Sequence, residues 1–222
     1  EDGIRDVAVT GVQTCALPIS FSSDPELVGQ LATALIQGLH ESGSASVGKH
    51  FPGHGHVQAD SHVAVPIDKR SRQQIEISDL IPYKMLVPAG LRAVMPAHVI
   101  YQEVDHLPAG FSKFWLQHVL RASLGFKGMI FSDDLVMEGA SVAGSIVERG
   151  RLALDAGCDM VLVCNSPHAT EELLCNLGTA ALDAKRAESM RGHPERRDSQ
   201  RYLDSLALLE ASFGQGGGSS AD

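Results

Sequence analysis

The stretch KHFPGHGHVQADSHVAVP, residues 49–66, decides how the rest of the chain is interpreted. It holds four of the ten histidines, together with a lysine and an aspartate. Pro52, Gly53 and Gly55 break helices and strands, whereas Ala45-Ser46-Val47 just before it is typical of a buried strand. The sequence therefore predicts a strand that runs into a long polar loop, where binding and catalytic groups tend to collect.

Asp60-Ser61-His62 is the most specific part of this loop. A carboxylate two residues from an imidazole can accept the ring N–H, fix the tautomer and raise the basicity of the other nitrogen. This pattern predicts a proton donor and acceptor suited to neutral pH. A purely structural histidine is the alternative reading of His62.

Outward from this loop, short apolar strands alternate with helices. Strands are expected at 45–49, 91–95, 129–131 and 160–164, and helices from Pro25 to before Gly43, at 71–86, at 113–123, at 143–156 and from 168. Such alternation indicates an α/β fold with a parallel sheet covered by helices. Polar residues follow each strand: Lys49-His50, His98, Asp133-Asp134 and Asn165. In α/β barrels the chemistry lies at this edge of the strands.

Composition narrows the possible partners. A net charge of −9 argues against nucleic acid or an anionic membrane as partner, and no apolar run reaches the roughly 18–20 residues of a membrane span. The cysteines at 15, 158, 164 and 175 show neither zinc-like spacing nor a disulfide framework. Cys158 and Cys164 flank an apolar strand, which favours buried free thiols in a reducing compartment.

The ends of the chain differ from its middle. Residues 1–20 show no continuous apolar face and resemble a translated sequencing adapter, so we expect them to be non-native. We expect a partial catalytic barrel over 21–180, a helical segment over 181–213 and a disordered Gly/Ser-rich tail over 214–222.

Three residue assignments remain open from the pattern alone. Of Asp133 and Asp134, one could cap the following helix and the other could act as a nucleophile. His98 could face a ligand or be a buried polar packing residue. A zinc site could combine the histidines at 50, 54, 56 and 62 with Asp60 or Asp133, but the His50–His54 spacing aligns ligands only on a helix. We therefore expect no metal and no other cofactor.

Several motifs together resemble the family 3 glycoside hydrolases, and most closely their bacterial β-N-acetylhexosaminidase branch, which recycles peptidoglycan. They are KHFPGHG at 49–55, DSH at 60–62, MPAHVIY at 95–101, GFKGMIFSDDLVMEGA at 125–140 and DAGCDM at 155–160. The likeness covers about residues 20–180 in the family's order.

The resemblance implies a (β/α)8 TIM barrel that removes terminal β-linked N-acetylglucosamine from a muropeptide or disaccharide in the cytoplasm, with retention of configuration. Asp133 would be the nucleophile and His62 the acid and base, oriented by Asp60. Lys49 and His50 would hold sugar hydroxyls. Apart from the resemblance, we expect His98, which follows a strand, to contact the substrate.

Two departures from the family pattern bear on activity. The family's barrel begins upstream of Phe21, so we expect about the first three strands to be missing, and Ile19 stands where the family has an arginine. Half a barrel leaves two open sheet edges and exposed apolar helix faces. The rival hypotheses are a non-catalytic sugar-binding half-barrel that needs a partner and a zinc-dependent hydrolase.

Overall fold

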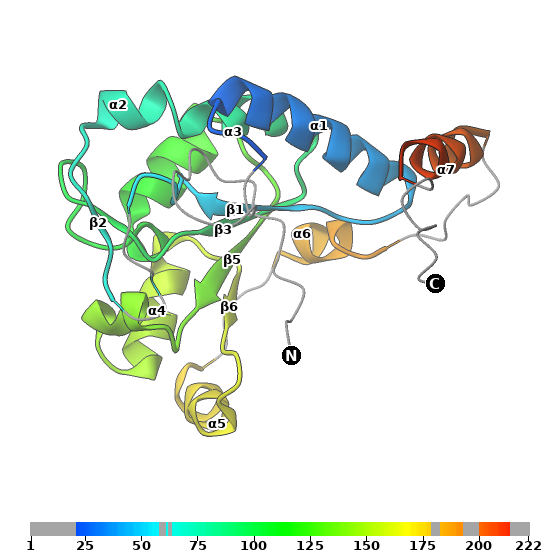
Figure 1. Ribbon diagram of the computed structural model, residues 1–222. Coiled ribbons are helices and arrows are strands. Elements are labelled where there is room, and N and C mark those ends of the chain that lie inside the picture. Colours follow the sequence, from blue (N-terminus) through cyan, green and yellow to red (C-terminus); the bar gives the residue numbers. More distant parts are fainter. Residues whose placement is uncertain (1–20, 58–60, 62–63, 179–182, 193–199, 214–222) are drawn as a thin grey trace, which may run out of the picture.

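A computed structural model describes residues 21–57, 61, 64–178, 183–192 and 200–213 (Figure 1). The strands are β1 (Val47–Phe51), β2 (Ile67–Asp68), β3 (Ala93–Pro96), β4 (Ile100–Tyr101), β5 (Met129–Asp134) and β6 (Met160–Leu162). The helices are α1 (Pro25–Glu41), α2 (Arg72–Glu76), α3 (Leu80–Leu86), α4 (Ile146–Ala156), α5 (Pro167–Asn176), α6 (Ala184–Ser189) and α7 (Gln200–Phe213). Shorter or tighter helical segments are η1 (Ala109–Phe111), the π-helical η2 (Phe114–Ser123) and η3 (Glu138–Ala143). None of the helices described here could span a membrane.

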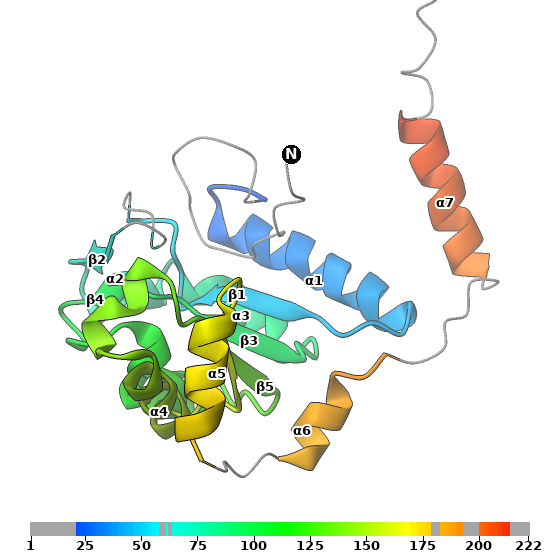
Figure 2. The same cartoon turned by 90° about the horizontal axis from the view of Figure 1, so that it is seen from below.

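The central sheet is parallel, in the order β1-β3-β5-β6, which confirms the predicted α/β architecture. Figure 1 shows α1 and α3 on one side of the strands, with α4 and α5 beyond β5 and β6. Within the described residues β1 and β6 are edge strands, so this sheet is open at both edges. Figure 2 shows α7 extending away from the sheet, with α6 between the sheet and α7 along the chain. Arg201 of α7 pairs with Glu41, the last residue of α1, at 2.6 Å.

Helix α1 shows how the sequence pattern produces the fold. Asp24 caps it by accepting the backbone N–H groups of Glu26 and Leu27. One face is buried, through Val28, Ala32 and Ile36. A second apolar row remains 40–42% exposed, as expected for an incomplete barrel: Leu27, Leu31 and Leu35.

Other elements differ from the expected ones. The single helix expected over 71–86 is two, α2 and α3, because the backbone turns at 77–79, where Asp79 binds Arg70 instead of continuing a helix. The small parallel sheet β2–β4 was not expected, since two-residue strands carry no periodicity. Cys158 is buried and free as expected, but the expectation was wrong for Cys164, which is exposed just beyond the edge strand β6.

An aromatic cluster fixes the start of the histidine loop in the core. Phe51 packs edge-on against Tyr83 and Trp115, with ring centroids 5.1 Å and 6.2 Å away. Tyr101 contacts Trp115 at 5.0 Å, and its hydroxyl donates to the carbonyl of Gly53 at 2.5 Å. All four rings are fully buried, so the end of β1, which carries Lys49 and His50, is anchored against a rigid apolar cluster.

Candidate active site

His50 and Asp133 lie together at the carboxyl edge of the sheet. The Nε2 atom of His50 is 3.6 Å from Oδ2 of Asp133. Asp133 is buried, and the His50 side chain is 23% exposed. The two residues come from β1 and β5, which are separated by β3, so their side chains meet across the end of the middle strand. The structure thus brings together two of the residues that the sequence pointed to.

Burial controls the charge of His50. Loss of solvation lowers its pKa to about 4; the Asp133 carboxylate opposes this shift, while Lys49, His54 and His98 reinforce it. The imidazole is therefore neutral at pH 7. A neutral ring can donate from one nitrogen and accept at the other, which suits contact with a hydroxyl group.

The two adjacent aspartates have different surroundings. The Oδ1 atom of Asp134 accepts the backbone N–H of Val136 at 3.1 Å and that of Cys164 at 3.0 Å. Asp134 thus caps the turn after β5, and its carboxylate is occupied by backbone donors. Asp133 directs Oδ2 toward His50. This division agrees with the sequence-based alternative in which each aspartate has its own role.

His98 is fully buried beneath the site rather than on its surface. Its Nε2 atom lies 3.0 Å from the carbonyl oxygen of Asp134, and its ring stacks on Phe111 with centroids 5.5 Å apart. Burial lowers the pKa of the ring, and the nearby Asp133 carboxylate opposes this. The geometry favours the packing alternative for His98; direct substrate contact stays a prediction.

Asp60 and His62 lie outside the described residues. Ser61 between them is described: it is buried, and its carbonyl accepts the N–H of Gly139 at 2.8 Å. A Cβ atom on Gly139 would come within 2.8 Å of the His98 Cβ and 3.1 Å of the Ser61 carbonyl. Only glycine allows the segment after β5 to approach both the His98 backbone and the histidine loop this closely.

A buried ion-pair cluster packs against the histidine loop at Gly53. The sequence analysis did not predict this cluster. Arg70 binds the Asp68 carboxylate at 2.7 Å and the Asp79 carboxylate at 2.6 Å. Burial alone would lower the pKa of Arg70, but the hydrogen bonds and charges of both aspartates raise it. Gly53 packs directly on Asp79, so closely that a Cβ would overlap it. The charged run Asp68-Lys69-Arg70 was the available signal, but its partner Asp79 could not be identified from spacing.

Metal ligands do not gather in the described part of the chain. Among those residues no three His, Cys, Asp or Glu side chains are grouped so that they could hold a metal ion. His50 and Asp133 form a pair, and His54 lies edge-on to His50 with ring centroids 6.1 Å apart. The larger zinc set considered from the sequence includes Asp60 and His62, which are outside the described residues.

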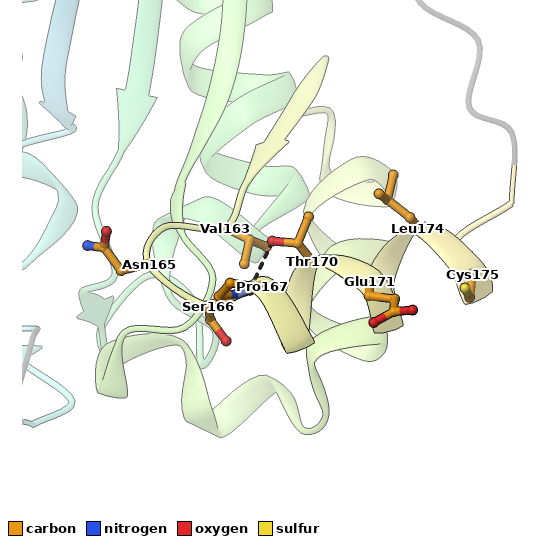
Figure 3. A pocket seen from close by; sticks show the side chains of 8 residues that line it. All are labelled: Val163, Asn165, Ser166, Pro167, Thr170, Glu171, Leu174 and Cys175. Carbon is orange, nitrogen blue, oxygen red and sulfur yellow. Dashed lines mark hydrogen bonds between the residues drawn. The ribbon is translucent and has the colours of Figure 1, made fainter.

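A separate hollow of about 520 Å³ lies beside β6 and α5 (Figure 3). Its lining comes from the β6–α5 connection and one side of α5: Val163, Asn165, Ser166, Pro167, Thr170, Glu171, Leu174 and Cys175. It contains neither His50 nor Asp133. Asn165, one of the polar residues that follow a strand, has a left-handed backbone with φ 56°. The hollow adjoins the open edge of the sheet, so we assign it no catalytic role.

Comparison with known proteins places these residues in a family. The glycosyl hydrolase family 3 N-terminal domain matches residues 11–189. A β-hexosaminidase from Thiobacillus denitrificans is 52% identical over 196 residues, 84% of this chain and 55% of that protein. Another from Tolumonas auensis is 58% identical over 172 residues, 77% of this chain and 51% of that protein.

Solved structures agree with the sequence comparison. NagZ from Neisseria gonorrhoeae superposes with a TM-score of 0.76 at 43% identity, over 87% of this chain and 58% of that one. The same protein with N-trifluoroacetyl-D-glucosamine gives 0.77 at 44% identity, with the same coverage. This chain spans about half the length of the curated relatives it matches. With the parallel sheet and the His50–Asp133 pair in place, the match shows that the chain belongs to glycosyl hydrolase family 3.

Proposed function

We propose that the protein is a retaining exo-β-N-acetylglucosaminidase. The observation that carries this proposal is the approach of His50 to Asp133, 3.6 Å apart at the carboxyl edge of a parallel sheet. The chain that holds this pair is 52–58% identical to two β-hexosaminidases. A buried carboxylate beside a neutral imidazole suits covalent attack on a sugar.

In the proposed reaction, an Asp133 oxygen attacks the anomeric carbon while the bond to the leaving oxygen breaks. His62 gives its proton to that oxygen and then takes one from the water that cleaves the glycosyl–aspartate ester. Two inversions at the same carbon yield net retention. Histidine here replaces the second carboxylate of the commonest glycosidases, which avoids repulsion between two anions beside Asp133.

The anchored Ser61 supports the proposed positions of the acid and its partner. Ser61 is covalently joined to both Asp60 and His62, and its carbonyl is tied to Gly139, which follows β5 closely in the chain. Because Asp133 lies near the end of the same strand, this tie supports a dyad that works on the Asp133 side of the sheet.

The proposed substrate is a small carbohydrate with a terminal β-linked N-acetylglucosamine, such as a muropeptide or disaccharide. A solved relative was studied with N-trifluoroacetyl-D-glucosamine, which supports this class. Lys49 and His50 would hold its hydroxyls. A role in peptidoglycan recycling in the cytoplasm rests on the motif resemblance, and no cofactor is required.

A chromogenic β-N-acetylglucosaminide tests the proposal. Wild-type protein should release the chromophore, whereas Asp133→Ala and His62→Ala should each be nearly inactive. Asp183→Ala is the matched control and should keep the wild-type rate, because Asp183 caps α6 and lies near the residues that precede β3 and β5, at the opposite edge of the sheet from Asp133. Wild-type rates from Asp133→Ala would reject the assignment, and activity that chelator removes and zinc restores would favour the zinc-dependent hydrolase.

The open edges β1 and β6, with the exposed leucine row of α1, favour one alternative: a non-catalytic sugar-binding half-barrel that needs a partner. Size-exclusion chromatography and thermal melting by circular dichroism separate the two. A monomer that melts cooperatively and hydrolyses the substrate excludes the alternative. The alternative is supported if the chain folds only with a partner and binds the sugar without cleaving it.

A further inference from the structure

Asp134 joins the ends of three strands. It is the last residue of β5, and its carbonyl lies 3.0 Å from Nε2 of His98, which follows β3. Its Oδ1 atom accepts the N–H of Cys164, which follows β6, at 3.0 Å. The same oxygen also caps Val136. No sequence motif assigns this role to Asp134, because its partners come from different strands.

This junction determines how the Asp133 carboxylate is oriented. The backbone N–H of Asp134 donates to Oδ1 of Asp133 at 2.8 Å. The other oxygen, Oδ2, faces His50. A rotation of the Asp133–Asp134 peptide would therefore break the Oδ1 hydrogen bond and turn Oδ2 away from His50. Two hydrogen bonds resist such a rotation. His98, which follows β3, holds the carbonyl of Asp134, and Cys164, which follows β6 on the other side of β5, holds its carboxylate.

The state of His98 follows from its partner. A carbonyl oxygen can only accept, so Nε2 of His98 must carry the proton. The other nitrogen, Nδ1, is buried and has no hydrogen-bond partner among the residues that the structure describes. A proton on Nδ1 would be a buried donor without an acceptor, which is costly. His98 is thus a neutral donor with a fixed tautomer, and its stacking on Phe111 fixes the ring plane.

We propose that Asp134, held by His98 and Cys164, is a positioning residue that selects Oδ2 of Asp133 as the attacking oxygen. The proposal deepens the hydrolase function above and rests on Asp133 being the nucleophile. The Asp134 side chain touches no substrate in this scheme and acts only through Asp133. The required property is an oxygen acceptor at Oδ1, not the negative charge.

Steady-state kinetics of two Asp134 variants test this role. Asp134→Ala removes the acceptor for Val136 and Cys164, and kcat should fall about 10–100-fold, the range that a small misplacement of a reacting group can cost. The KM should change less than about threefold, because ground-state contacts to the sugar remain. Asp134→Asn keeps an acceptor oxygen and should recover kcat to within a few-fold of wild type.

Ser132→Ala is the matched control. Its buried hydroxyl accepts the N–H of Leu162 at 2.9 Å, so the variant also loses a hydrogen bond between β5 and β6, but not one made by Asp134. It should lower the melting temperature while leaving kcat near wild type. If Asp134→Ala does not fold, Cys164→Pro is the substitute, at an exposed position. It removes the N–H of residue 164, one of the two that donate to Oδ1 of Asp134. It should lower kcat by a smaller factor than the roughly 10–100-fold expected for Asp134→Ala.

Two results would overturn the proposal. One is equal kcat for Asp134→Ala and Ser132→Ala at similar melting temperatures, which makes Asp134 only structural. The other is an Asp134→Asn variant as slow as Asp134→Ala, which makes charge the relevant property.

The Asp133→Ala variant in the same assay distinguishes failure of the proposed function from failure of the positioning role. If Asp133→Ala retains the wild-type rate, the proposed function fails. If Asp133→Ala is inactive while Asp134→Ala is unimpaired, only the positioning role fails.

Discussion

His50 and Asp133 face each other across the end of β3, with Nε2 of the imidazole 3.6 Å from Oδ2 of the carboxylate. This separation is longer than a good hydrogen bond, so the carboxylate oxygen is not committed to the ring. Because the imidazole is neutral at pH 7, Asp133 keeps a nucleophilic oxygen instead of being neutralised in an ion pair. The pair therefore predicts a pH dependence of stability through His50 and a covalent bond to the sugar at Asp133.

Stability should depend on pH through His50. Its folded pKa of about 4 lies below the usual 6.5, so the unfolded chain binds the proton more readily. Stability should therefore be unaffected by this group above pH 6.5 and fall as the pH drops from 6.5 to about 4. The loss should be at most about 3 kcal/mol and smaller in practice, because the ring is partly exposed to solvent.

Urea unfolding at a series of pH values measures this effect. His50→Gln should flatten the curve between pH 4 and 6.5, although buried His98, whose pKa is also lowered, contributes a loss of the same sign. His168→Gln, at an exposed position on α5, should leave the curve as in wild type. An unchanged slope in His50→Gln would show that the ring is not desolvated.

The Asp68–Arg70–Asp79 cluster should be essential for folding of the loop region. Arg70→Ala would leave two buried carboxylates without their cation, which typically costs 3–5 kcal/mol. Chemical denaturation measures the change. The exposed pair Arg72–Glu76 offers a comparison, and Arg72→Ala should cost less than about 1 kcal/mol. Similar losses in both variants would contradict the structural role of the cluster.

Gly139 should not tolerate a side chain. In Gly139→Ala the new Cβ would meet the His98 Cβ at 2.8 Å and the His98 carbonyl at 3.0 Å, and overpacking of this kind costs about 1–3 kcal/mol. Gly38→Ala is the control. Gly38 lies inside α1, and apart from the helix's own backbone no atom of the described residues comes within 4 Å of the new Cβ. That variant should gain about 0.5–1 kcal/mol. Equal stability of the two variants would contradict the close approach at Gly139.

The proposed dyad should determine one limb of the pH–rate profile. If His62 is the acid and base, Asp60→Asn weakens its orientation and should lower kcat and shift that limb to lower pH, because the imidazolium loses its carboxylate partner. The rate should be followed from pH 4 to 9 with the chromogenic substrate. If this limb does not move in Asp60→Asn, Asp60 does not act as the partner of His62.

The sequence was most informative where periodicity and capping agree. Asp24 and Pro25 marked the start of α1, and the four apolar segments became the parallel strands. The resemblance at 49–66 identified His50 before any geometry was known. What the sequence could not determine depended on contacts distant in sequence. The single helix expected over 71–86 was wrong, because the break between α2 and α3 follows from the Arg70–Asp79 ion pair. The burial of His98, which the pattern had left open, follows from Phe111 and Asp134.

The exposure of Cys164 shows a different limit. An apolar strand such as 160–164 predicts burial on both faces, but β6 is an edge strand here and Met160 is 40% exposed. The sequence pattern does not distinguish an edge strand from a central one when both are short apolar runs. Sheet order, and with it the exposure of side chains after a strand, appears only once the strands are paired.

Intact-protein and peptide mass spectrometry, after incubation with a slow fluorinated β-N-acetylglucosaminide, tests the central claim most directly. The claim is that Asp133 forms a covalent bond to the sugar. The account predicts one added glycosyl group on the peptide that contains Asp133, and no addition in Asp133→Ala. A wild-type protein that turns over the substrate without an adduct, or carries it on another residue, would contradict the account.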